Sequence, residues 1–217
     1  MSDTPELALD IKLPARSAYD LRGPSGPWID YFRKTYPQWA KASELRDARP
    51  RPWPKGFEPA ATPVFAHNEI AVAAPAERVF RALLDARAWP TYYENASKIE
   101  LPAGVEHLGA GVRFGFTTFG VAFDAQITLF ELNVALGWTC TGGTPELSVH
   151  HRWLLEPEAA GTRLVTEETN FISGFAWLGP LSRWCNQKLA ESGTREALPA
   201  AHERWLTELK RVLECRA

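Results

Sequence analysis

Between about residues 97 and 171 the chain reads as one strand after another, and this run constrains the fold more than any other feature. Its segments alternate apolar and polar residues or are rich in β-branched and aromatic residues, with turn clusters between them. A further strand is predicted over 64–73, which gives about seven strands and favours an antiparallel sheet. The segments of the run are 97–101, 111–119, 121–132, 136–141, 147–157 and 162–171.

Helical patterns flank these strands. Pro75 suits the start of a helix over 73–85, and a second short helix, broken at Pro90, is predicted over 86–96. Helical spacing returns from 177 to 216, where Gly193 and Pro199 would cost about 1 and 3 kcal/mol in a helix interior. We therefore expect a kink or two consecutive helices there. A curved antiparallel sheet of about seven strands wrapped round a C-terminal helix, an α+β fold, fits this order of elements.

The N-terminal part of the chain is different, since ten of the 17 prolines lie before residue 64. Regular structure is not expected over 48–63, because proline removes a backbone donor and favours extended neighbours. We expect residues 1–63 to form an arm or linker and residues 64–217 to form the main domain. A short amphipathic helix is predicted over 24–39, whose aromatic face packs on the domain, docks a partner or a second subunit as in a homodimer, or lies on a membrane surface.

Charge and motifs exclude several classes of function. Lys plus Arg total 24 against 26 for Asp plus Glu, so no basic surface for nucleic acid is expected. Cys140, Cys185 and Cys215 form no C-x-x-C pair, and no stretch approaches 18 apolar residues, which favours a cytoplasmic protein without stable membrane insertion. Phosphate-loop, dinucleotide, serine-hydrolase and zincin motifs are missing from the sequence. His150 and His151 should point to opposite sides of a strand, so neither a metal nor another cofactor is expected.

Three short motifs carry a resemblance to a known family. They are P-x-E-x-V-F at 75–80, W-P at 89–90 and G-T-R-L at 161–164, within the stretches 74–101 and 155–175. Over about residues 64–215 the chain resembles the START-like superfamily (SRPBCC), in its branch of polyketide cyclase/dehydrase and lipid-transport proteins. The resemblance implies a helix-grip fold and a hydrophobic small molecule, such as a lipid, polyketide or aromatic compound, enclosed between sheet and C-terminal helix.

Strand alternation predicts which side chains line that space. On 121–130 one face is apolar and the other carries Asp124, Gln126 and Thr128, so the apolar face should point inward. The same reasoning on the other strands gives a mainly aromatic and aliphatic wall, typical of pockets for apolar ligands. The predicted ligand-binding residues are Tyr92, Tyr93, Phe114, Phe116, Phe123, Ile127, Trp138, Cys140, Val149, Trp153 and Thr166.

Few polar groups interrupt this wall. His151 lies in the apolar register of its strand, whereas His150 should face solvent, as should Arg113 and Arg152. On the last strand the inner face carries either Thr166 and Glu168 or, in the opposite phase, Glu167. His151 with Glu168 or Glu167 could be an acid/base pair for cyclisation or dehydration, or His151 could be a hydrogen-bonded structural residue.

Tyr92 and Tyr93 should edge the mouth of the space. They could orient a polar ligand group, or form a lid whose hydroxyls reach water. The sequence therefore predicts a protein that binds or carries a hydrophobic small molecule. The alternative is an enzyme of the polyketide cyclase/dehydratase type, with His151 and a glutamate as its acid/base pair.

Overall fold

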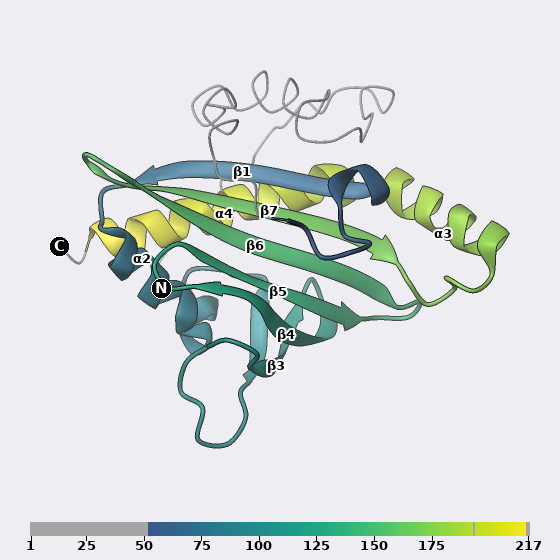
Figure 1. Cartoon of the computed structure of the whole chain (residues 1–217), viewed down its shortest axis with the longest axis horizontal. Helices are drawn as coiled ribbons and strands as arrows, with labels where there is room; N and C mark the ends of the chain where they lie inside the picture. Colours follow the sequence, from purple (N-terminus) through teal and green to yellow (C-terminus); the bar gives the residue numbers. More distant parts are fainter. Residues whose placement is uncertain (1–51, 193, 216–217) are drawn as a thin grey trace, which may run out of the picture.

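The structure is a computed structural model that describes residues 52–192 and 194–215. Its strands are β1 (Val64–Val72), β2 (Ala96–Glu100), β3 (Arg113–Thr118), β4 (Val121–Glu131), β5 (Ala135–Gly142), β6 (Leu147–Glu158) and β7 (Gly161–Ile172). They form one antiparallel sheet in the order β1-β7-β6-β5-β4-β3-β2. Each strand from β2 to β6 therefore pairs with the next one along the chain, and β1 completes the sheet beside β7 (Figure 1).

Tight turns explain why the strands pair in sequence order. Phe119 and Gly120, the two residues between β3 and β4, both have positive φ angles, of 50° and 76°. That conformation gives the two-residue hairpin whose twist matches the twist of a sheet. At the start of β7, a Cβ on Gly161 would lie 2.1 Å from the carbonyl oxygen of Val72, so only glycine lets β1 approach this hairpin.

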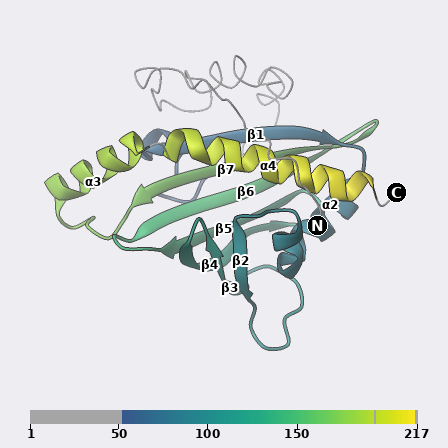
Figure 2. The same ribbon diagram turned by 180° about the vertical axis from the view of Figure 1, so that it is seen from behind.

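Helices cover the concave face of the sheet. Between β1 and β2 lie α2 (Ala76–Leu84) and the 3₁₀ helix η4 (Ala86–Thr91), and after β7 come α3 (Gly179–Glu191) and α4 (Thr194–Glu214). Helix α4 runs across the sheet and packs against β1, as the view from behind shows (Figure 2). The expected helix-grip arrangement, α+β with a curved sheet around a C-terminal helix, is confirmed.

The C-terminal region consists of two consecutive helices, as the sequence predicts. The break lies between Glu191 and Thr194, at the predicted Ser192 and Gly193. Pro199, by contrast, lies inside α4 and does not interrupt it. It falls early in the helix and is buried, so the packing of this turn on the sheet offsets the lost backbone hydrogen bond.

The described part of the proline-rich stretch, residues 52–63, lies on the outward face of the sheet. As expected, it is irregular apart from the short 3₁₀ helix η3 (Pro59–Ala61). Trp53 contacts the rings of Phe65 and His150, and Phe57 contacts those of His150 and Phe171. The helix predicted over 24–39 lies outside the described residues.

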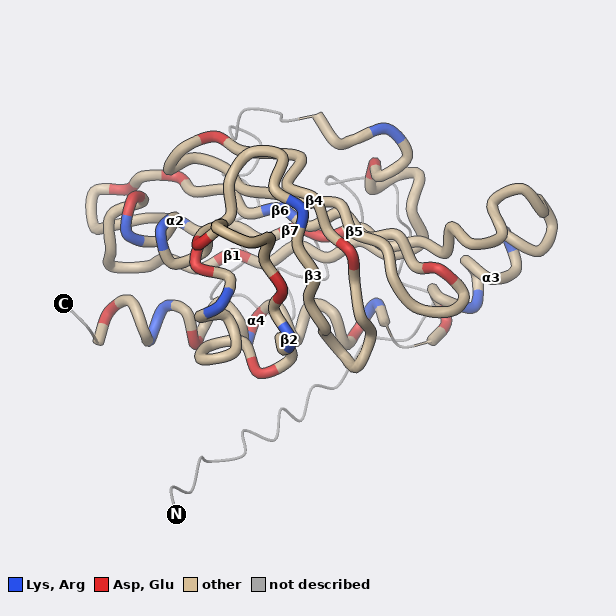
Figure 3. Tube along the Cα trace, turned by 90° about the horizontal axis from the view of Figure 1, so that it is seen from below, with Lys and Arg blue, Asp and Glu red and all other residues tan. Residues whose placement is uncertain are grey.

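Charged residues of both signs are interspersed along the described chain (Figure 3). None of the helices in residues 52–192 and 194–215 is both long and apolar enough to cross a membrane.

Candidate functional site

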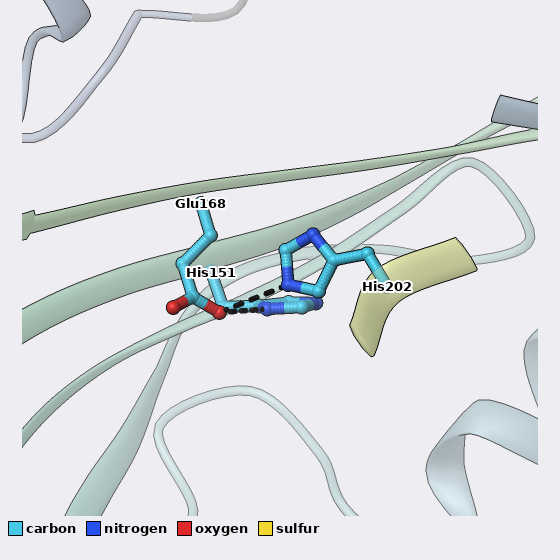
Figure 4. A group of neighbouring side chains, drawn as sticks. All are labelled: His151, Glu168 and His202. Atoms are coloured by element: carbon cyan, nitrogen blue, oxygen red, sulfur yellow. Dashed lines mark hydrogen bonds and ion pairs between the residues drawn. The ribbon is translucent and has the colours of Figure 1, made fainter. Parts of the chain in front are cut away.

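Three side chains from three elements meet on the inner face of the sheet. His151 on β6 lies directly opposite Glu168 on β7, and its Nδ1 is 2.7 Å from Oε2 of the carboxylate. The same oxygen is 3.3 Å from Nε2 of His202 on α4. Figure 4 shows both rings converging on this oxygen, whereas the second carboxylate oxygen points away from them. We call these three residues the Glu168 cluster.

The sheet register positions the cluster. Trp138 on β5 is the strand partner of His151, and the two rings stack with centroids 4.5 Å apart. On the other side, the partner of Glu168 on β1 is Ala66, a fully buried residue against which Leu198 of α4 packs. Because alanine is small, α4 can come close enough for His202 to reach the carboxylate.

Burial and hydrogen bonding set the protonation states. Burial raises the pKa of Glu168, but hydrogen bonds from His151 and His202 outweigh it and hold that pKa well below its usual range. Burial lowers the pKa of His151 to about 4, although its bond to Glu168 opposes the shift. At neutral pH the cluster therefore contains a carboxylate and a neutral His151, whose Nδ1–H donates to Glu168 and whose Nε2 carries the lone pair.

A hydroxyl group completes this chain of hydrogen bonds. Oγ1 of Thr166 lies 3.1 Å from Nε2 of His151 and donates to it. The order hydroxyl, imidazole, carboxylate is that of a nucleophilic triad. Thr166 is fully buried and lies behind the wall of the cavity described next, so a substrate there does not reach its hydroxyl. Its role here is to hold the tautomer of His151.

A cavity of about 340 Å³ lies beside the cluster, between the inner face of the sheet and helices α3 and α4. His151 and Glu168 form part of its wall, together with Tyr93, Thr118 and Asn170. The rest of the wall is mostly apolar and includes Phe116, Phe123, Trp138, Val149, Leu198 and Trp205. A carboxylate therefore lies at one place in the wall of a largely apolar, partly enclosed cavity.

Tyr93 is held rigidly in this wall. Its ring stacks on Trp205 with centroids 4.0 Å apart, and its hydroxyl is 3.2 Å from Oγ1 of Thr118. Burial raises the pKa of Tyr93, so the hydroxyl stays protonated and can donate. Oδ1 of Asn170 is buried and has no hydrogen-bond partner in the described structure. The cavity thus offers polar groups that a bound molecule could satisfy.

A second hollow, of about 690 Å³, lies on the outward face of β3, β4 and β5. It is an open groove, and the polar side chains along it include Arg113, Asp124 and Thr139. The Glu168 cluster lies on the opposite face of the sheet. The cavity beside the cluster is the less open of the two and combines apolar walls with perturbed titratable groups, so it is the better candidate for a site.

With this geometry in place, comparison with known proteins identifies the family. A family model described as polyketide cyclase/dehydrase and lipid transport matches residues 66–214. The chain belongs to this family. No curated protein matches the chain.

Solved structures of the same fold accompany the family match. A hypothetical protein from Helicobacter pylori is 29% identical, with a TM-score of 0.62 over 76% of this chain and 96% of its own. An aromatase/cyclase from a Streptomyces species is 17% identical, with a TM-score of 0.54 over 70% of this chain and 94% of its own. A protein from Chromobacterium violaceum is 17% identical, with a TM-score of 0.51 over 70% and 98%. These similarities support the fold of the polyketide cyclase and lipid-transport family.

Many of the predicted site residues line the cavity of this family member. Of the two alternatives for the last strand, β7, the structure has Glu168 on the inner face and Glu167 on the outer face. Those that line the cavity are Tyr93, Phe116, Phe123, Trp138, Cys140, Val149, His151 and Glu168. Phe114, Ile127 and Trp153 are buried in the core, and Tyr92 donates to the carbonyl of Ala82 over 2.8 Å. Together with Thr166, these four lie outside the cavity wall.

Three expectations about solvent exposure are wrong. His150 and Arg152 do point outward, but they are 2% and 7% exposed because residues 52–62 cover this part of the sheet. Trp53 contacts the ring of His150 and the guanidinium of Arg152. Tyr92 and Tyr93 are also buried, with their hydroxyls bonded inside the protein, so they do not form a lid with its tips in water.

Sequence reasoning missed the contribution of α4, above all His202. Helical spacing carries a signal for it, since His202 lies three residues before Trp205 and four after Leu198, on the buried face. The fold thus joins His151 and His202, which lie far apart in the sequence, on one carboxylate. Spacing along one helix does not show which strand residue the helix will meet.

Proposed function

We propose that this chain binds a small, largely apolar molecule with an aromatic ring in the cavity beside the Glu168 cluster. The observation that carries the proposal is the partly enclosed space of about 340 Å³ between sheet and helices. This volume lies in the range of small-molecule sites, and apolar side chains, several of them aromatic, supply most of its wall. Phe116, Phe123, Trp138 and Trp205 contribute aromatic surface to this wall, against which a ring of the ligand can pack.

The polar groups of the cavity narrow the chemistry of this molecule. Glu168 is ionised, and its second oxygen points away from both histidines, so it can accept another hydrogen bond. A ligand hydroxyl or amine can donate to it. A ligand carboxylate would instead place a second negative charge in a site of low polarity, which is unfavourable. The proposed ligand is therefore a phenol, an enol or an alcohol rather than an acid.

Calorimetric titration with 2-naphthol and 2-naphthoate tests this proposal. We expect 2-naphthol to bind at least tenfold more tightly, which corresponds to about 1.4 kcal/mol. Ala197→Trp should abolish binding because Ala197 lines the cavity, whereas Ala200→Trp, on the same helix but outside the wall, should not. The proposed site would be contradicted if Ala197→Trp and Ala200→Trp bound 2-naphthol equally well, or if 2-naphthoate bound more tightly than 2-naphthol.

The second candidate is an enzyme of the polyketide cyclase/dehydrase type. The observation that favours it is a carboxylate with a neutral imidazole at the cavity wall, where Glu168 could take a proton from a carbon next to a carbonyl while Tyr93 donates to that carbonyl. Both titrating groups have lowered pKa values and are weak bases at neutral pH, which is why binding ranks first. In an enzyme, Glu168→Gln would abolish turnover and keep 2-naphthol binding within about tenfold.

A further inference from the structure

We propose that the Glu168 cluster is a binding site for one divalent transition-metal ion, held by Nδ1 of His151, the carboxylate of Glu168 and Nε2 of His202. These ligand atoms lie within 4.8 Å of one another, on residues that are buried or nearly so. The inference goes beyond the binding of an apolar molecule and does not depend on it.

The donor set defines the class of ion. Two imidazole nitrogens and one carboxylate are typical ligands of zinc and of non-haem iron, whereas magnesium and calcium prefer oxygen ligands. Ligand atoms about 2.0–2.1 Å from an ion lie about 2.8–3.4 Å apart at right or tetrahedral angles. The nitrogen–oxygen distances in the cluster are 2.7 Å and 3.3 Å, so small side-chain shifts give that spacing.

The protons on both rings can move out of the way. Coordination through Nδ1 requires His151 to carry its proton on Nε2, where the Thr166 hydroxyl, 3.1 Å away, can accept it as well as donate. Coordination through Nε2 requires His202 to carry its proton on Nδ1, a buried atom that has no hydrogen-bond partner in the described structure. The tautomer change therefore breaks only the two bonds to Glu168, which the ion replaces.

The surroundings suit an ion with open coordination positions. His151 and Glu168 both line the cavity, so an ion held by three protein ligands would face the same space as a bound molecule. Thr166 behind His151 and the stacked ring of Trp138 hold the first imidazole in place, as supporting groups do around metal ligands. A dication would also compensate the buried negative charge of Glu168.

Titration of the chelator-treated full chain with Co²⁺ tests the site, with visible absorption and calorimetry as readouts. A Cys215→Ser background removes the exposed thiol as a competing ligand. We expect one ion per chain, a visible band of bound Co²⁺, displacement by Zn²⁺ and a rise in Tm with the metal. Glu168→Gln and His202→Gln should each weaken binding at least 100-fold, whereas His107→Gln, an exposed histidine outside the cluster, should leave it unchanged.

Two results would overturn the proposal: the absence of one-to-one binding, or variants of the cluster that bind Co²⁺ like the unaltered chain. Cooperative unfolding shows that each variant is folded, and Glu168→Gln serves alone if His202→Gln does not fold. Binding of 2-naphthol is measured in the same samples. If 2-naphthol binds and Co²⁺ does not, this inference fails while the proposed function stands.

Discussion

Glu167 and Glu168 are neighbours in the sequence, yet they lie on opposite faces of the sheet in opposite kinds of surroundings. Glu167 faces outward and is held by Arg152 and His67, at 2.6 Å and 3.0 Å. Glu168 faces inward, is held by two imidazoles, and keeps one oxygen directed away from them. The outer carboxylate thus has cations on both of its oxygens, and the inner one retains bonding capacity beside a cavity.

The histidines bonded to these glutamates differ in the same way. Burial lowers the pKa of His67, but hydrogen bonds to Glu167 and Glu69 outweigh it and raise the pKa to about 9. Burial lowers the pKa of His151 to about 4; the bond to Glu168 opposes this shift and the neighbouring His202 adds to it. In these two histidines burial acts in the same direction, and the charged groups beside each ring decide whether the pKa ends above or below its usual value. A closed ionic network supports structure, and an incompletely satisfied one is where binding is expected.

The largest effect should come from breaking the outer network with Arg152→Met. This change leaves Glu167 buried without its arginine and removes the guanidinium that lies 3.8 Å from the ring of Trp53. The free energy of unfolding should fall by about 3–5 kcal/mol. Chemical denaturation measures it, with the exposed Arg113→Met as a control that stays within about 0.5 kcal/mol. A loss for Arg152→Met as small as that of the control would show that the network is not sealed from water.

The pH dependence of stability should separate the two histidines. Because the pKa of His67 is raised to about 9 from 6.5, its contribution is fully present below pH 6.5 and is lost as the pH rises to 9. The loss should be roughly 3 kcal/mol. His67→Gln should flatten the curve of unfolding free energy across this window, and a curve that still falls in the variant would assign the loss to another group.

For His151, on the inner face, the pH range over which stability changes lies on the acid side of neutrality. The pKa of His151 is lowered to about 4 from 6.5, so its contribution is present above pH 6.5 and is lost as the pH falls towards 4. Glu167 titrates lower still, because Arg152 and His67 overcome the effect of burial and lower its pKa to about 2. Below pH 4 the outer carboxylate therefore adds to the loss.

The smallest effect should come from Thr166→Val. The change removes the hydroxyl that bonds Nε2 of His151 and costs about 1 kcal/mol of unfolding free energy. It also frees that nitrogen, so ¹⁵N NMR should show a changed tautomer balance for His151. Thr128→Val, on an exposed outward position of β4, is the matched control. An unaltered His151 signal in Thr166→Val would mean that Glu168 alone holds the tautomer.

Much of the fold could be predicted because periodicity reports local structure. Alternation located the strands of the sheet, and Gly193 marked the break between α3 and α4. Part of the site followed from the same rule, because alternation along a strand shows which of its side chains share a face. His151 lies on the apolar face of β6, as predicted, and pairs there with Glu168 of β7. Alternation left the phase of β7 open between Glu167 and Glu168, and packing against α4 decides it.

What sequence could not supply is contact between distant segments. His202 reaches Glu168 from a helix that begins 26 residues later. Likewise, alternation placed Arg152 on the outward face but gave no sign that Trp53 would cover it. The face to which a side chain points is a local property of its strand. Whether another segment buries that side chain depends on the path of a distant part of the chain.

The break between α3 and α4 bears on how the proposed ligand would enter and leave the cavity. The joint between the two helices is also part of the cavity wall, which includes Leu189, Ser192, Thr194 and Ala197. The side-chain hydrogen bonds of Ser192 at this joint, to Leu189 and Thr194, are exposed to water. If the proposed ligand passes this joint, its exchange requires only a local opening of low free energy, independent of how firmly the rest of the protein resists unfolding.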